Sequence, residues 1–158
     1  MEPRLNLNAS PLAATSMKYL ASASKAVMAG STLPKATQDL VLLRASQLNG
    51  CGFCTDMHGK DLAHDGQSAT RINLVAVWRE ATVYTDAERA ALELTEQGTR
   101  LADAAAGVTD AAWAAAAEHY DQEQLAALVM LISLINAGNR IGVITRLPGG
   151  AYTPGQFA

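Results

Sequence analysis

The sequence predicts an all-α protein, and three observations support this fold class. Alanine supplies much of the 49% hydrophobic content, whereas aromatic residues contribute only 5%. Alanine-rich segments with few β-branched residues favour packed helices over sheets. Apolar residues recur at helical spacing along most of the chain, and no segment alternates convincingly as a strand would. We therefore expect a bundle of about seven amphipathic helices joined by short loops.

Four helices are expected in the first half of the chain, after an irregular arm of nine or ten residues. Ser10 can cap the first helix and Pro11 can open it, because proline at the first helical position loses no hydrogen bond. The Asn49–Gly50 pair is a turn signal, Gly66 suits a helix C-cap, and Ser68 can cap the fourth helix. The four helices are expected at residues 11–28, 34–48, 51–64 and 69–81.

Three more helices are expected in the second half. Thr85 and Glu88 form a capping box, and Thr109 and Asp121 can each cap a later helix. The last helix is apolar over much of its surface, so we expect it at the centre or at a subunit interface. Residues 148–150 should stop it, and an irregular tail should follow. These helices are expected at residues 86–101, 110–119 and 122–146.

Length and charge narrow the class of protein. A chain of 158 residues suits a single domain, 1–158. The net charge is −3 and no dense Lys/Arg run is present, so no nucleic-acid footprint is expected. The N-terminus lacks an apolar core behind a basic region, which argues against a signal peptide. The most apolar stretch, residues 125–135, is short for a membrane span of about 20 residues. We expect a soluble, cytoplasmic protein.

The two cysteines of the chain form a CxxC motif followed by a histidine. On one helix, Cys51, Cys54 and His58 are three, four and seven residues apart, so they share a face. Cys51 would lie in the first turn, where free N–H groups and the helix dipole favour a thiolate. A free thiol is only about 3% thiolate at pH 7, so a modest fall in its pKa enlarges the nucleophilic fraction. His58 is placed to exchange a proton. This arrangement suits attack on a peroxide or a disulfide.

The cysteines admit three other interpretations. Zinc needs four ligands in a tetrahedron, and His64 would lie about 60° off the His58 direction and roughly 9 Å further along the helix. A permanent disulfide across so short a loop constrains the unfolded chain little, and a reducing cytosol opposes it. Two buried, inert cysteines are a common arrangement, but the neighbouring histidine on the same face argues against it.

Three segments carry a resemblance to a known family. They are "DLVLLRASQLNGCGFCTDMHGKDLA", "WREATVYTDAERAALELTE" and "LINAGNRIGV", in this order between residues 39 and 143. They resemble the alkyl hydroperoxidase D-like (AhpD-like) proteins of the carboxymuconolactone decarboxylase superfamily. The resemblance implies an all-α AhpD-type fold and a homotrimer or homohexamer with the cysteine site close to subunit contacts.

The resemblance also implies roles for individual residues. Cys54 would attack the hydroperoxide and Cys51 would resolve the sulfenic acid, with His58 as proton-relay partner. The helix-dipole argument alone favours Cys51 as the more activated thiol. The family's relay glutamate stands twelve residues before the first cysteine, where this chain has Asp39, which is one methylene shorter. The best-known members carry a histidine where this chain has Phe53, which cannot move protons.

The expected function is that of a thiol-dependent alkyl hydroperoxide reductase. It would need no cofactor, would act on a small hydroperoxide and would be reset by a dithiol such as a lipoyl or thioredoxin-like protein. One alternative is a decarboxylase of lactone acids, as the superfamily name suggests. Another is a non-enzymatic helical oligomer in which the cysteines act as a redox sensor or bind metal.

Overall fold

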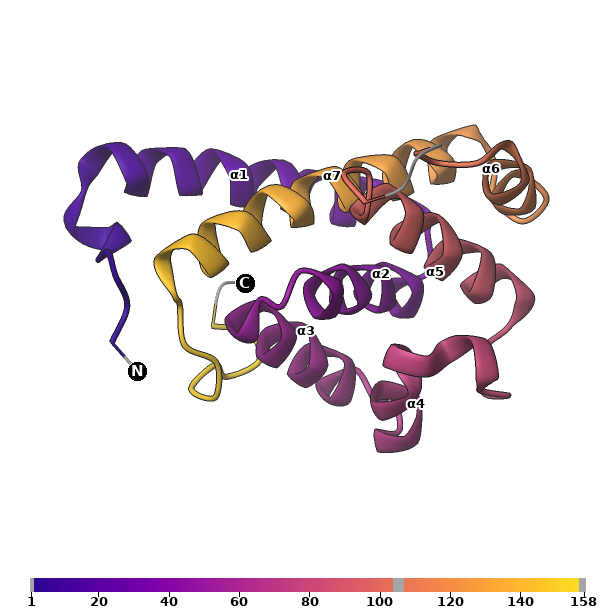
Figure 1. The fold of residues 1–158 in the computed structure, drawn as a ribbon, viewed down its shortest axis with the longest axis horizontal. Helices are drawn as coiled ribbons and strands as arrows, with labels where there is room; N and C mark the ends of the chain where they lie inside the picture. Colours follow the sequence, from indigo (N-terminus) through magenta and orange to yellow (C-terminus); the bar gives the residue numbers. More distant parts are fainter. Residues whose placement is uncertain (1, 104–106, 157–158) are drawn as a thin grey trace.

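A computed structural model describes residues 2–103 and 107–156. Within these residues the regular structure consists of seven α-helices and two short 3₁₀-helices, without strands (Figure 1). This confirms the all-α prediction. The elements are η1 (Leu7–Ala9), α1 (Pro11–Gly30), α2 (Lys35–Leu48), α3 (Gly52–His64), α4 (Ala69–Leu74), η2 (Val75–Glu80), α5 (Asp86–Thr99), α6 (Asp110–Ala117) and α7 (Gln122–Thr145).

Side-chain caps start the helices at the positions that the sequence indicates. Each cap accepts a hydrogen bond from a backbone N–H of the first turn, which satisfies a donor that the helix leaves free. The capping residues are Ser10, Ser68, Thr85, Thr109 and Asp121. Gly66 follows α3 with φ +84, the left-handed conformation that favours glycine at a helix end. The helix starts were therefore predictable from short-range chemistry.

The expected helix over residues 69–81 is broken into α4 and η2. Val77 interrupts it with φ −126 and ψ 32. The break turns Trp78 into the interior, where its indole N–H donates a hydrogen bond to Glu96 at 2.9 Å and only 5% of the residue is exposed. Tertiary packing of one large side chain thus overrides the local helical pattern.

Helix α2 is the central element of the bundle. Nine of its fourteen residues are buried, so it lacks a solvent face over most of its length. Leu42 and its neighbours on one side pack against α5, α6 and α7, while Leu40 and Leu43 pack against α3, η2 and α5. The sequence predicted only the last helix to lie at the centre or at a subunit interface, and it gave no such indication for α2. Because both flanks of α2 are covered, polar residues on it, such as Asp39 and Ser46, are held inside the protein.

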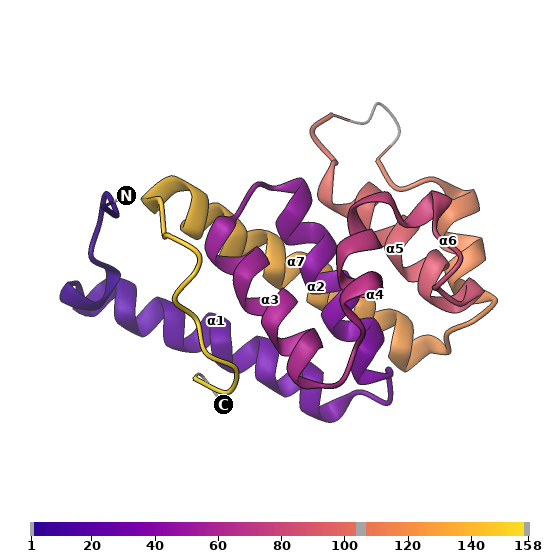
Figure 2. The ribbon, with the colours of Figure 1, turned by 90° about the horizontal axis from the view of Figure 1, so that it is seen from below.

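Helix α7 runs beside α1 and crosses the bundle (Figures 1 and 2). By length and composition its 24 residues could cross a membrane. In the folded chain its buried face includes Leu128 and Leu131, which belong to the same hydrophobic cluster as Leu42. The chain then leaves α7 at Arg146, in the left-handed conformation with φ 56, and turns back toward α3. This path brings the end of α7 and the tail onto the cysteine helix.

Candidate redox site

Cys51 is the N-cap of α3. The preceding Gly50 has φ +67, and this turn directs the backbone N–H of Cys51 to the carbonyl of Ser46 at 3.0 Å. The Cys51 sulfur accepts a hydrogen bond from the backbone N–H of Cys54 at 3.3 Å. The sulfur therefore occupies the positive end of the helix dipole, where a thiolate is stabilised.

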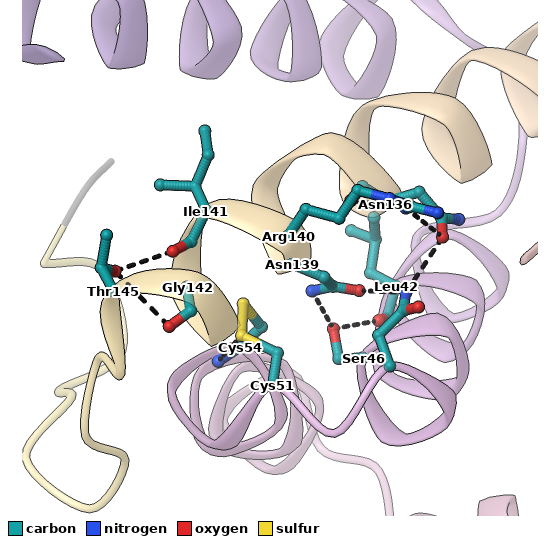
Figure 3. Close-up of a disulfide and its surroundings, with 11 residues drawn as sticks. Leu42, Ser46, Cys51, Cys54, Asn136, Asn139, Arg140, Ile141, Gly142 and Thr145 are labelled. Atoms are coloured by element: carbon teal, nitrogen blue, oxygen red, sulfur yellow. Dashed lines mark hydrogen bonds between the residues drawn. A yellow bond between two sulfur atoms is a disulfide. The ribbon is translucent and has the colours of Figure 1, made fainter.

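Cys51 and Cys54 are joined by a disulfide, with their Cα atoms 5.3 Å apart. Both are buried, with 1% of Cys51 and 6% of Cys54 exposed. Gly142 of α7 lies against the bridge (Figure 3): a Cβ atom at this position would be 2.8 Å from the Cys51 sulfur and 3.7 Å from the Cys54 sulfur. Only glycine lets α7 approach the sulfurs this closely. The helix lies closer to the Cys51 sulfur than to the Cys54 sulfur.

An amide network fixes the segment that leads into Cys51 (Figure 3). Asn49 donates to the side-chain oxygens of Asn136 and Asn139, both at 3.0 Å. Asn139 is fully buried and donates to the Ser46 hydroxyl at 3.1 Å. Arg140 donates to the Asn136 side-chain oxygen at 3.1 Å. These bonds tie the end of α2 to α7, so they position the cysteine turn without contacting the sulfurs.

His58 lies on α3 one turn after Cys54 and is 7% exposed. Neither of its ring nitrogens has a hydrogen-bond partner among the described residues, although both are buried. Burial, and to a smaller extent the positive charge of Lys35, lowers the pKa of His58 to about 4. His58 is therefore neutral near pH 7. Buried polar atoms without partners are rare, and a catalytic role is one of the reasons for which they are kept.

Asp39 lies on α2 and is 1% exposed. Its carboxylate binds Lys35 at 2.5 Å, and Lys35 also binds Asp65 at 2.9 Å. Burial raises the pKa of Asp39, and the hydrogen bond and charge of Lys35 act against this rise. Among the described residues, no hydrogen bond connects Asp39 to His58. The structure brings the two groups to neighbouring helices, with Lys35 as the charged group that acts on both.

The remaining sequence candidates lie outside this arrangement. Phe53 occupies the first turn of α3 and is half-buried. His64 and His119 are both exposed. Across residues 2–103 and 107–156, no three His, Cys, Asp or Glu side chains gather as they would to hold a metal ion. The zinc interpretation therefore has no ligand set in the described part of the chain.

Comparison with known proteins assigns the chain to a family. Residues 14–97, more than half of the chain, match the family model of the carboxymuconolactone decarboxylase family. The chain belongs to this family. The uncharacterised protein YdfG of Bacillus subtilis is 40% identical over 113 residues, which are 72% of this chain and 76% of YdfG. The family resemblance seen in the sequence is thereby confirmed.

Solved structures of similar proteins place this family member among the AhpD-like proteins. A protein of unknown function from Agrobacterium tumefaciens, described as a candidate antioxidant defence protein AhpD, has a TM-score of 0.87 and 36% identity. The match covers 96% of this chain and all of that one. The debrominase Bmp8 has a TM-score of 0.78 at 16% identity, over 92% of this chain and 75% of Bmp8, which shows a shared fold alone.

Three features of the site were not found from the sequence. Lys35 stands four residues before Asp39, and this spacing was the available signal for their ion pair. Gly142 gave no signal, because its contact with Cys51 joins residues 91 positions apart in the chain. The contact of the C-terminal tail with Asp56 also joins distant positions. Long-range contacts of this kind depend on how the helices pack.

Proposed function

We propose that this family member is a thiol-dependent hydroperoxide reductase that cycles Cys51 and Cys54 between dithiol and disulfide. The single observation that carries the proposal is the bonded cysteine pair at the start of α3, one turn from the unpartnered ring of His58. A decarboxylase has no need of two cysteines at bonding distance, so the pair favours redox chemistry. A sensor would share the bridge but would not turn over peroxide.

The proposed reaction balances atoms and electrons over the cysteine pair. The Cys54 thiolate attacks the distal oxygen of the hydroperoxide, the O–O bond breaks, and the alcohol leaves with one proton. Cys51 then attacks the sulfur of the Cys54 sulfenic acid, the S–O bond breaks, and water leaves with the second proton. The peroxide gains two electrons, and the two thiols lose them as the disulfide forms.

The burial of the two sulfurs supports this division of roles. Cys54 is the more exposed cysteine, whereas Cys51 lies beneath Gly142. Cys51 sits at the positive end of the α3 dipole, which suits a thiolate that waits to resolve the sulfenic acid and later leaves when the bridge is reduced. The dipole argument for Cys51 and the attacker role of Cys54 are thus compatible.

We assign proton handling to His58 and electrostatic support to Asp39. A neutral imidazole can accept the Cys54 proton and return it to the leaving alkoxide, directly or through water. Lys35 opposes protonation of His58, so its pairing with Asp39 moderates the positive charge that His58 experiences. Phe53 adds no proton donor, which leaves His58 as the acid–base group of the cysteine turn.

Regeneration and assembly complete the proposal. A dithiol, either a small thiol or a lipoyl or thioredoxin-like protein, reduces the bridge by exchange in a cytoplasmic setting. We also propose a homotrimer or homohexamer. Large apolar side chains exposed on α1 and α7 support an assembly, among them Leu12 at 79%, Tyr19 at 70% and Ile144 at 66%.

Peroxide turnover by cysteine variants tests the function. With dithiothreitol as reductant, the wild type should consume cumene hydroperoxide, and Cys54→Ser should lose this activity completely. In the absence of dithiothreitol, Cys51→Ser should consume one equivalent of peroxide and retain a sulfenic acid that dimedone traps and mass spectrometry detects. Peroxide consumption that survives in Cys54→Ser would overturn the mechanism. Turnover of a carboxymuconolactone without peroxide consumption would establish the decarboxylase alternative.

A further inference from the structure

The chain after α7 is bound along α3 through its main chain (Figure 2). The Asp56 carboxylate accepts hydrogen bonds from the backbone N–H groups of Gly150 at 2.8 Å and Tyr152 at 3.3 Å. The Lys60 ammonium donates to the carbonyl oxygens of the same two residues at 3.0 and 2.9 Å. Asp56 and Lys60, themselves an ion pair at 2.9 Å, therefore bind alternate residues of the tail much as a neighbouring strand would.

The tail contacts the cysteine turn at Gly149. A Cβ atom on Gly149 would be 2.6 Å from the carbonyl oxygen of Gly52, the residue after Cys51. At the other end, Tyr152 is 7% exposed and its hydroxyl donates to Asp61 at 2.8 Å. Burial, with the hydrogen bond to Asp61, raises the pKa of Tyr152 to about 12, so this hydroxyl remains a donor. The segment is thus fixed at both ends of the site.

The position of this segment matters for reduction of the bridge. Exchange requires a thiolate to reach one sulfur of a disulfide and form a mixed disulfide. Gly142 covers the sulfurs from α7, while Gly149 covers the backbone of Gly52 beside them. Only 1% of Cys51 and 6% of Cys54 remain exposed. A small dithiol can reach the exposed part of Cys54, whereas a dithiol on a protein surface needs the cover to move.

We propose that residues 149–152 form a strap, held by Asp56 and Lys60, that selects which thiols reduce the Cys51–Cys54 disulfide. Small dithiols react with the strap in place, and a dithiol protein reacts when the strap is released. In both cases the dithiol is oxidised, the S–S bond breaks, and two electrons and two protons pass to the cysteines. The inference rests on the reduction step of the proposed function.

Reduction rates with two reductants of different size test the strap. The bridge is first formed with diamide, so the test does not depend on peroxide chemistry. Dithiothreitol or a thioredoxin then reduces it, and acid quenching, alkylation and mass spectrometry follow the free thiols. Asp56→Ala removes the acceptor of two N–H groups and the partner of Lys60, so it should accelerate reduction by the thioredoxin about tenfold. Reduction by dithiothreitol should change less than about twofold.

Two further variants keep the experiment decisive. Asp110→Ala removes an exposed aspartate on α6, away from the tail, and should react as the wild type does with both reductants. Tyr152→Phe removes the hydroxyl that donates to Asp61 and should accelerate the thioredoxin reaction by a smaller factor, which applies even if Asp56→Ala fails to fold. Faster hydrogen exchange at the amides of Gly150 and Tyr152 should accompany each acceleration.

The outcomes separate the strap from the peroxidase function. Equal acceleration of both reductants, or no acceleration of either, would overturn the strap as a selector. A wild-type bridge that dithiols reduce but hydroperoxides fail to re-form would overturn the peroxidase proposal and leave the strap unaffected. Selective acceleration of the larger reductant supports the strap whatever oxidant forms the bridge.

Discussion

Two buried polar clusters of this protein are built in opposite ways. The Glu96 carboxylate accepts hydrogen bonds from Arg44 at 2.7 Å, Trp78 at 2.9 Å and Arg79 at 2.6 Å. Burial alone would raise the pKa of Glu96, but these donors hold it below its usual range. The ring of His58, by contrast, is buried with no partner on either nitrogen among the described residues.

The difference between the two clusters indicates which one stabilises the fold and which one takes part in the reaction. A saturated buried network rigidifies the fold, and here it joins α2, η2 and α5. An unsaturated buried group is costly to maintain, and such costs concentrate at functional sites. The Glu96 cluster should therefore control stability, while the His58 region should control reactivity and pH response.

Removal of Glu96 should have the largest effect of the variants that test this comparison. Glu96→Ala leaves Arg44 and Trp78 without their acceptor in a region where the Arg44 side chain is only 11% exposed. We expect the free energy of unfolding to fall by about 3–5 kcal/mol, as measured by urea denaturation. Glu93→Ala breaks the pair with the half-exposed Arg79 and the hydrogen bond from Gln97, and it should cost less than about 1 kcal/mol. Similar losses in both variants would contradict the structural role of Glu96.

The pH dependence of stability tests the role assigned to the buried His58 ring. The pKa of His58 is about 4 in the folded chain and 6.5 in the unfolded chain. Between these values only the unfolded state binds the proton, so stability should fall by up to about 3 kcal/mol as the pH drops from 6.5 to 4. Above pH 6.5 this contribution is fully present.

Two histidine variants isolate that contribution. His58→Gln should flatten the pH profile of the unfolding free energy in this window, since the titrating group is gone. His119→Gln, at an exposed histidine, should retain the wild-type slope. A slope in His58→Gln equal to that of the wild type would show that other groups dominate the response.

Substitutions at two glycines on α7 should have the smallest effects, and these effects should have opposite signs. Gly142→Ala places a methyl group 2.8 Å from the Cys51 sulfur, and we expect a loss of about 1–3 kcal/mol in the oxidised protein. A Cβ on Gly138 meets nothing within 4 Å, so Gly138→Ala should stabilise the same helix by about 0.5–1 kcal/mol. Thermal unfolding of both variants measures the difference. Equal effects of the two substitutions on thermal unfolding would mean that α7 is not in close contact with the disulfide.

The sequence predicts the local parts of this protein well and its long-range parts poorly. Helix starts at Ser10, Thr85 and Asp121 follow from side-chain oxygens that bind nearby N–H groups, so a few neighbouring residues contain the signal. The kink at Val77 does not follow, because Glu96, nineteen positions later, draws Trp78 inward.

The candidate site divides in the same way. Helical spacing places Cys51, Cys54 and His58 together, and the structure shows the pair bonded. The four-residue spacing of Lys35 and Asp39 is a local signal for their ion pair, whereas the contact of Gly142 with the sulfurs depends on packing that spacing does not encode. The roles of the four predicted site residues stay predictions, which the peroxide assay tests.

The hydrogen bonds that Asp56 and Lys60 form with the backbone of the tail have an evolutionary consequence. Because Asp56 and Lys60 bind backbone atoms of the tail, the exposed residues Ala151 and Thr153 can change while these hydrogen bonds remain. The constrained positions are Gly149, Gly150 with its φ of +110, and Tyr152. Descendants of this chain can therefore exchange the side chains that an approaching partner meets while the cysteine helix stays unaltered. Partner choice and thiol chemistry can then diverge separately, and tail grafting between homologues is a direct route to redirecting this protein.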